Sequence, residues 1–155
     1  MKGEEVLHIV AVRAMHAAEP LNTELGKVNG YIIEYKKGAE VYRIYWTGDT
    51  VWFDEIAQFK QYGDLSLLLP HVGAVGAGSA LGRRGLDAAE TIRIINALHP
   101  ALTIPVHHTT FTHYREPISV LQQQAAGLPG TWKIELPVAG KIVDLTSYGS
   151  NRTVK

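Results

Sequence analysis

The sequence of 155 residues contains no cysteine. This absence excludes disulfide bonds, thiolate nucleophiles and cysteine-ligated zinc, so a metal ion has to be held by histidine, aspartate or glutamate. Neither sign of charge is in excess, because fifteen Lys and Arg residues balance fifteen Asp and Glu residues. A balanced chain gives no electrostatic reason to expect nucleic acid or an anionic membrane surface as a partner.

Long apolar runs are also missing, and no stretch approaches the ~20 apolar residues that span a bilayer. The N-terminal stretch MKGEEVLHIVAVRA is acidic early and has no apolar segment followed by a clear cleavage site. We therefore expect a cytoplasmic protein without a membrane span. A hydrophobic share of 46% is typical of a globular chain. The length predicts a single domain over residues 1–155, with residues 146–155 as a flexible C-terminal tail.

Strands and helices alternate along most of the chain. Apolar and β-branched patterns predict strands at residues 6–13, 64–70 and 101–106, a hairpin over 30–50, and two short strands within 131–145. Helices are predicted at 52–63, 86–100 and 116–127, the second of them with Asp87 and Glu90 as a capping box. The stretches 14–29 and 71–85 are predicted as loops. This order predicts a layered α/β fold.

Residues that can bind a metal follow four of the predicted strands. His16 comes after the first, Asp49 ends the hairpin in YWTGDT, His71 follows DLSLLLP, and His107 and His108 follow TIPV. Ligand sites in open α/β sheets gather at the carboxyl ends of strands. A carboxylate and histidines at one sheet edge suit Zn²⁺, Mn²⁺ or a similar ion, which lowers the pKa of bound water to ~7.

Each of these residues also has a structural interpretation. Asp49 or Thr50 can cap the helix that follows. His16 and His71, taken singly, fit packing or turn positions, and the remaining histidines fit structural or surface positions: His8, His99 and His113. His107 differs, because a polar ring at the end of a buried strand is costly unless a partner satisfies it.

The glycine-rich stretch after residue 70 offers another hypothesis. Gly73, Gly76 and Gly78 follow a strand, as the glycines of a phosphate-binding turn do. Their spacing is GxxGxG rather than GxGxxG, no helix follows at once, and the chain has no GKS or GKT. The glycines equally permit a turn or a close approach of the loop to another group.

Four segments together resemble the metallo-β-lactamase-fold hydrolases. They are VNGYIIEY, YRIYWTGDT, DLSLLLPHVGA and LDAAETIRIINALHPALTIPVHHTTFTHYREP. The nearest branch contains ascorbate-phosphate lactonases and N-acylphosphatidylethanolamine phospholipase D-type proteins, and the resemblance covers roughly residues 5 to 145. It implies an αββα sandwich with a mixed sheet and helices.

The resemblance also implies roles for individual residues. The family's metal-binding histidine after an early strand corresponds to His16, its bridging aspartate to Asp49, and the histidine of its IPxH segment to His107. Asp49 and His107 are then also the catalytic pair, while His71 and His108 are expected to contact substrate. The implied cofactor is a divalent metal, zinc first and Mn or Fe otherwise. The implied substrate is a small-molecule ester, lactone or phosphodiester.

The family's HxHxDH motif does not occur in this chain. The chain therefore resembles the C-terminal half of such a hydrolase, and we expect a homo-oligomer or a separate N-terminal-half polypeptide to complete it. Two other functions stay open from the sequence. One is a truncated, non-catalytic binding or assembly module, and the other is a small phosphate- or nucleotide-binding α/β protein.

Overall fold

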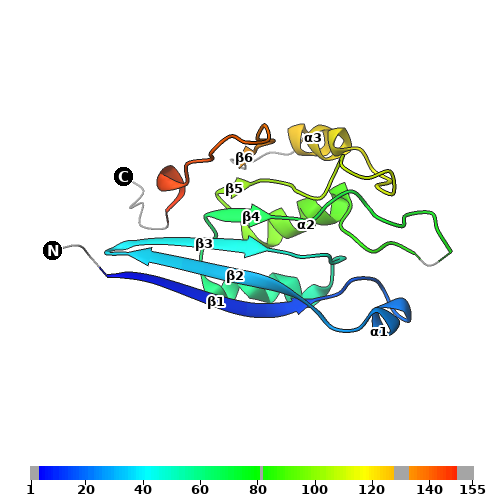
Figure 1. The fold of residues 1–155 in the computed structure, drawn as a ribbon, viewed down its shortest axis with the longest axis horizontal. Coiled ribbons are helices and arrows are strands. Elements are labelled where there is room, and N and C mark those ends of the chain that lie inside the picture. Colours follow the sequence, from blue (N-terminus) through cyan, green and yellow to red (C-terminus); the bar gives the residue numbers. More distant parts are fainter. Residues whose placement is uncertain (1–3, 81, 128–132, 150–155) are drawn as a thin grey trace.

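The computed structural model describes residues 4–80, 82–127 and 133–149, which form one six-stranded mixed sheet (Figure 1). The strands lie side by side in chain order: β1 (Glu5–Ala14), β2 (Val28–Lys37), β3 (Glu40–Trp46), β4 (Leu67–Leu69), β5 (Leu102–Thr103) and β6 (Lys133–Ile134). The first three strands pair antiparallel, and β3 to β6 pair parallel. The predicted alternation of strands and helices is thus present.

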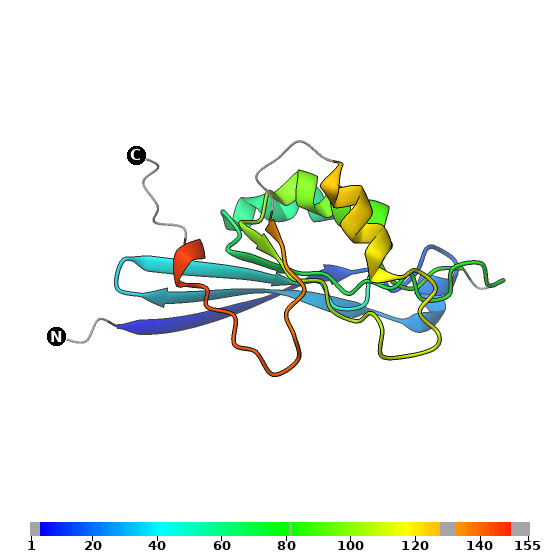
Figure 2. The same cartoon turned by 90° about the horizontal axis from the view of Figure 1, so that it is seen from above.

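Five short helices connect or follow these strands: α1 (Leu21–Leu25), η1 (Asp54–Tyr62), α2 (Ala88–Leu98), α3 (Ile118–Ala126) and η2 (Thr146–Tyr148). Figure 2 shows that η1, α2 and α3 all lie on the same face of the sheet. None of the described helices is long and apolar enough to cross a bilayer.

Several details differ from the sequence prediction. The helix at 54–62 is a 3-10 helix, because its apolar residues recur every three positions: Phe53, Ile56, Phe59 and Tyr62. The loop predicted at 14–29 contains α1. Of the two short strands expected within 131–145 only β6 is found, since residues 135–145 carry no strand. Within the predicted tail, Thr146–Tyr148 form η2, and residues 150–155 lie outside the described part.

The hydrophobic core lies between the helices and the sheet. Strand residues Val12, Ile32, Tyr45 and Leu68 are buried against side chains of the three covering helices: Ile56, Phe59, Ile92, Ile95 and Leu121. Burial of these side chains is the main source of stability in the described fold.

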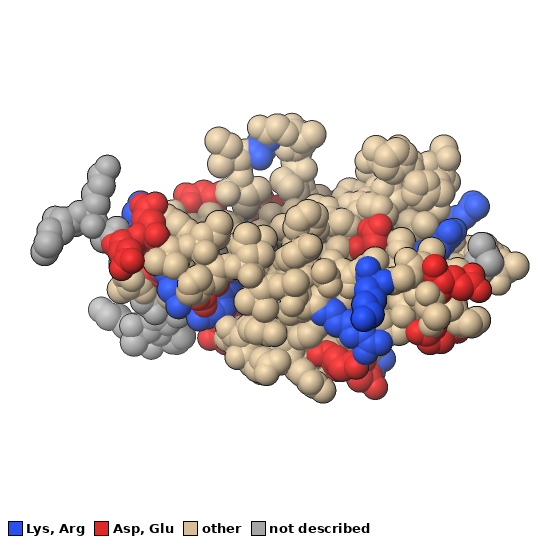
Figure 3. Space-filling model, turned by 60° about the horizontal axis from the view of Figure 1, so that its bottom comes forward, with Lys and Arg blue, Asp and Glu red and all other residues tan. Residues whose placement is uncertain are grey.

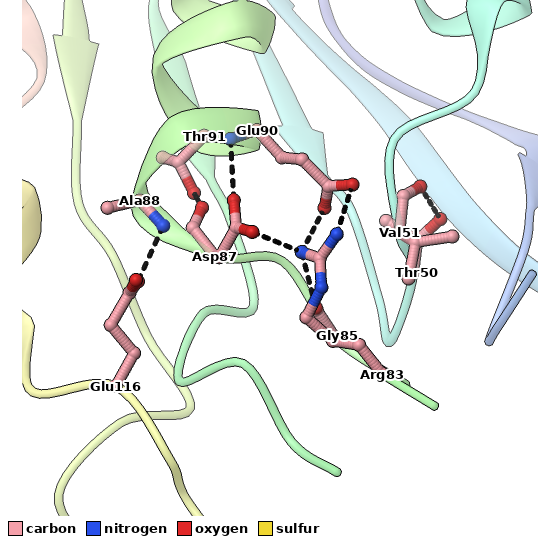
Figure 4. Close-up of polar contacts among 9 residues, drawn as sticks. All are labelled: Thr50, Val51, Arg83, Gly85, Asp87, Ala88, Glu90, Thr91 and Glu116. Atoms are coloured by element: carbon pink, nitrogen blue, oxygen red, sulfur yellow. Dashed lines mark hydrogen bonds and ion pairs between the residues drawn. The ribbon is translucent and has the colours of Figure 1, made fainter. Parts of the chain in front are cut away.

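The N-terminus of α2 is capped as predicted, but only on one side of the capping box. The Asp87 carboxylate accepts a hydrogen bond from the Glu90 backbone N–H at 2.8 Å (Figure 4). The Glu90 side chain does not return to the cap. It accepts two hydrogen bonds from the Arg83 guanidinium, each 2.6 Å long, and so fixes the end of the glycine-rich loop to the helix.

The opposite face of the sheet is apolar and only partly covered. Its β4–β5 portion packs against Val143, Leu145 and Tyr148. At the β1 end Leu7 and Ile9 are each 59% exposed, and their partners in the register are Tyr35 and Ile33 on the same face. No described helix covers this region. In the view of Figure 3 charges occur as small mixed groups separated by wide uncharged areas.

Two glycines let β2 pass close to the turn after β3. A Cβ on Gly30 would lie 2.8 Å from the Thr47 carbonyl oxygen, and a Cβ on Gly48 would lie 2.6 Å from the Asn29 carbonyl oxygen. Gly48 also has a φ of +61°, which glycine adopts without a steric cost. The turn that precedes Asp49 therefore packs against β2 through direct backbone–backbone contact.

We expect Gly48→Ala to destabilise the protein far more than Gly38→Ala. Gly38 has a similar φ of +58°, but a Cβ added there would meet nothing within 4 Å, so its cost is the left-handed conformation alone, about 1 kcal/mol. Gly48→Ala adds a clash with backbone and should cost more than twice as much. Chemical denaturation of both variants measures the difference. Equal losses would show that the close approach at Gly48 is not a constraint.

We further expect the isolated chain to self-associate through its uncovered sheet face. A contiguous apolar face in water favours association, and a second copy of the same face is the partner available in a pure sample. Light scattering should give a mass above the chain's 17.0 kDa. The double substitution Leu7→Lys with Ile9→Lys should lower it toward that value.

Val10→Lys is the matched control, because Val10 lies on the other face of the same strand. It should leave the mass of the assembly unchanged. A monomeric parent chain of 17.0 kDa would contradict the expectation.

Candidate metal centre

The carboxyl ends of β1, β3, β4 and β5 lie at the same end of the sheet (Figure 1). A side chain predicted for the site follows each strand after a short exit segment: His16, Asp49, His71 and His107. The topology therefore brings together four residues that are far apart in the sequence, as the convergence of strand ends predicts.

Asp49 lies at the centre of this group. Its Oδ1 is 2.9 Å from Nδ1 of His71 and 3.7 Å from Nε2 of His107. Its Oδ2 is 3.7 Å from Nε2 of His16. One carboxylate thus faces a different histidine nitrogen with each of its oxygens. Asp49, His71 and His107 also present ligand atoms that all lie within 4.8 Å of one another.

The threonines of the TGDT turn hold Asp49 in place. Thr47 Oγ1 accepts a hydrogen bond from the His71 backbone N–H at 3.0 Å. Thr50 Oγ1 accepts one from the Met15 backbone N–H at 3.0 Å and donates to the Val51 carbonyl oxygen, a contact drawn in Figure 4. Both threonines are fully buried. The two hydroxyls therefore tie the turn to the residues that carry His71 and His16.

The alternative interpretation of Asp49 as a helix cap is wrong. The next helix, η1, begins only at Asp54, and its N-cap residue is Phe53, which makes no side-chain cap. Asp49 instead directs its carboxylate at the histidines. Its pKa is lowered, chiefly by the hydrogen bond from His71; burial, the next largest effect, opposes this, and the neighbouring His107, His71 and His16 add smaller lowering effects.

His107 is held in an unusual backbone conformation. Its φ is +59°, which is uncommon for a non-glycine residue and is frequent at functional sites. Its Nδ1 contacts the Val72 carbonyl oxygen at 3.3 Å, which places a proton on Nδ1, and its Nε2 is the nitrogen that faces Asp49. The backbone bridge between His71 and Val106 places the two rings in a stack with centroids 5.2 Å apart.

Both ring nitrogens of His71 have partners. The Trp46 indole N–H, which can only donate, contacts His71 Nε2 at 2.5 Å. This hydrogen bond assigns the proton of the neutral ring to Nδ1, which then donates to Asp49 Oδ1. In this network both nitrogens of His71 are hydrogen-bonded and the ring orients the carboxylate of Asp49, although His71 also belongs to the three-residue group whose ligand atoms lie within 4.8 Å of one another.

A cleft of about 420 Å³ opens onto this group. His16, Asp49 and His107 line it together with four residues that the sequence did not assign to the site: Leu25, Val75, Arg84 and His113. His108 is not among the lining residues, and its Nδ1 lies 3.1 Å from the Thr109 hydroxyl. A larger hollow of about 620 Å³ beside β1 and α1 has no histidine or carboxylate in its walls.

In the sequence, the only sign that Arg84 and His113 line the cleft is that each belongs to a loop that follows a strand of the site. Arg84 closes the glycine-rich stretch, and His113 belongs to the histidine-rich segment after β5. Both loops lie at the end of the sheet where the carboxyl ends of β3 and β4 lie (Figure 1). Nothing in the local sequence says which side chains of a loop turn inward, so their position had to come from the structure.

Comparison with known proteins identifies the family. The family model of the beta-lactamase superfamily domain matches residues 2–108. A UPF0173 metal-dependent hydrolase from Enterococcus faecalis is 29% identical over 121 residues, which cover 75% of this chain and 48% of that protein.

Solved structures share the fold. Igni18, a metallo hydrolase from Ignicoccus hospitalis, superposes with a TM-score of 0.64 at 23% identity, over 88% of this chain and 52% of its own. An isothiocyanate hydrolase from Delia radicum gut bacteria gives a TM-score of 0.72 at 20% identity, over 87% of this chain and 52% of its own. The chain thus spans about half the length of these relatives.

The structural matches include a protein of the metallo-β-lactamase fold and a hydrolase of the metallo-β-lactamase superfamily. The predicted fold class is therefore confirmed. The family match covers well over half of the sequence and includes His16, Asp49, His71 and His107. The chain belongs to the beta-lactamase superfamily.

Proposed function

We propose that the protein acts as a metal-dependent hydrolase whose divalent ion is held by His16, Asp49 and His107. The observation that carries the proposal is the position of Asp49, whose two oxygens each lie 3.7 Å from the Nε2 atom of a different histidine. A carboxylate placed between two imidazoles in this way can bridge them through bound metal.

The donor set fits zinc. Zinc binds histidine nitrogen and carboxylate oxygen at roughly 2.0–2.2 Å, so two ligand atoms on one ion lie no more than ~4 Å apart. The distances from Asp49 to Nε2 of His16 and of His107 are within that limit, while the three residues whose ligand atoms all lie within 4.8 Å of one another are Asp49, His71 and His107. Three protein ligands are the usual number in a catalytic zinc site. Manganese or iron suits the same nitrogen and oxygen donors.

When bound, the ion would lower the pKa of water and polarise the ester or phosphoryl group under attack. The chain's own residues would hold the ion in position and supply the negative charge that faces it. Asp49 contributes a carboxylate with a lowered pKa, and His107 directs its Nε2 toward that carboxylate while its Nδ1 contacts the Val72 carbonyl oxygen. His71 keeps the Asp49 carboxylate turned into the cleft. Asp49 and His107 are thus the residues to which we assign catalysis.

The proposed substrate is a small-molecule ester, lactone or phosphodiester that enters the 420 Å³ cleft. His71 would act on it indirectly through Asp49. Contact between His108 and substrate stays a prediction. We propose the cytoplasm as the location, and a second copy of the chain as the partner that covers the open sheet face when no other polypeptide does.

A non-catalytic assembly module is the second candidate. It is favoured by the exposure of Leu7 and Ile9 on a sheet face that no described helix covers. Such a module has no need of a metal ion, so the metal content of the purified protein separates the two functions.

We expect purified protein to bind zinc and to lose it when a ligand is removed. After equilibration with zinc and dialysis, mass spectrometry should find metal in the parent chain and little in the His16→Ala, Asp49→Ala and His107→Ala variants. His108→Ala is the matched control, because His108 adjoins His107 but bonds to Thr109 instead of facing Asp49. It should retain the parent's zinc. A parent chain without zinc, or equal losses in His107→Ala and His108→Ala, would refute the assignment.

His71→Ala should weaken zinc binding without abolishing it. Loss of a residue that orients a metal ligand typically costs 10–100-fold in affinity. Titration against a competing chelator should therefore show a weaker dissociation constant but full occupancy at saturating zinc. Trp46→Phe removes the indole N–H and keeps an aromatic ring, so it should have a smaller effect in the same direction. If His71→Ala stays empty at saturating zinc, His71 is a ligand itself.

A further inference from the structure

The Arg84 side chain lies in the wall of the cleft, and its Nε has no hydrogen-bond partner among the described residues. It lines the same cleft as His16, Asp49 and His107, and its Nε is also inaccessible to solvent. Four other arginines are paired with a carboxylate, namely Arg13 with Glu55, Arg43 with Glu34, Arg83 with Glu90, and Arg93 with Asp54. Buried polar groups are normally satisfied, so Arg84 requires an explanation.

The backbone fixes where Arg84 lies. The segment that carries it returns antiparallel to the segment after His71. The Leu86 N–H donates to the His71 carbonyl oxygen at 3.3 Å, the Ala74 N–H to the Leu86 carbonyl oxygen at 3.0 Å, and the Arg84 N–H to the Val75 carbonyl oxygen at 2.7 Å. Arg84 is therefore connected to the Asp49 group by a short hydrogen-bonded ladder and not by a free loop.

Gly76 makes room for the guanidinium. It has a φ of +77°, and a Cβ built on it would lie 3.0 Å from Arg84 Nε and 3.1 Å from Arg84 Nη2. It would also lie 2.6 Å from the Gly82 carbonyl oxygen. Any side chain at this position would displace the guanidinium or the loop. The glycine-rich stretch thus serves to seat an arginine against backbone beside the cleft.

We propose that Arg84 binds an oxyanion of the substrate, so that the ester hydrolysed here carries a carboxylate or phosphate group. The inference rests on the proposed function, because it places the substrate in the cleft onto which the metal ligands open. A guanidinium is permanently charged, and its planar array of N–H donors matches the oxygens of a carboxylate or phosphate. Leu25 and Val75 add apolar surface for the remainder of the molecule.

The test uses two anions, methylphosphonate and acetate, on the full 155-residue chain. Binding is measured by calorimetry for the parent, Arg84→Gln and Arg115→Gln. Arg115 is the matched control, because the change removes the same charge from an exposed arginine outside the cleft-lining set. We expect Arg84→Gln to weaken binding of at least one anion tenfold or more, and Arg115→Gln to leave it unchanged. The anion with the larger loss identifies a phosphate or a carboxylate substrate.

Each titration is made with and without zinc, and zinc content is measured in every sample. Loss of anion binding in Arg84→Gln with zinc retained supports the inference. If the parent holds no zinc, the proposed metal site fails, but the zinc-free titrations still decide the role of Arg84. Equal anion affinities in the parent and Arg84→Gln, or no measurable anion binding by the parent, would overturn the proposed role of Arg84.

Arg84→Lys covers the case in which Arg84→Gln does not fold. Lysine keeps the charge but lacks the planar fork, so affinity should fall between that of the parent and complete loss. Parental affinity in a folded Arg84→Lys protein would show that the guanidinium is not what binds the anion.

Discussion

The carboxylate of Asp49 is the group around which the proposed site is built. Its turn is fixed by backbone contact at Gly48 and by the buried hydroxyls of Thr47 and Thr50, which reach the segments carrying His71 and His16. His107 is fixed separately, through the pairing of the segments after β4 and β5. The relative positions of the histidines and Asp49 therefore depend on the hydrogen bonds that join the segments following β1, β3, β4 and β5.

The same sheet has two faces with different roles. The helix-covered face is buried and supplies the rigidity that holds the strand exits in register. The other face is apolar but open near β1, and this chain matches only about half the length of the relatives that share the fold. A layer packed there would complete a sandwich and would add side chains around the proposed metal centre.

Much of the fold, and the fact that the candidate site residues lie close together, could be predicted from sequence for identifiable physical reasons. Strand ends converge in any open α/β sheet, so His16, Asp49 and His107 could be grouped without coordinates. The role of His71 could not, because it depends on an indole N–H supplied by Trp46 from a neighbouring strand. Arg84 could not either, since its inward position follows from backbone pairing within a loop whose sequence suggests only flexibility. The 3-10 form of η1 was recoverable in principle from its three-residue apolar repeat.

A crystal structure of the zinc-loaded chain, with anomalous diffraction recorded at the zinc edge, is the decisive test of the metal assignment. We predict an anomalous peak about 2 Å from a carboxylate oxygen of Asp49 and from Nε2 of both His107 and His16. We also predict that Nδ1 of His71 remains hydrogen-bonded to Asp49. Anomalous density elsewhere on the chain, or zinc bound directly to His71 with Asp49 turned away, would contradict the assignment.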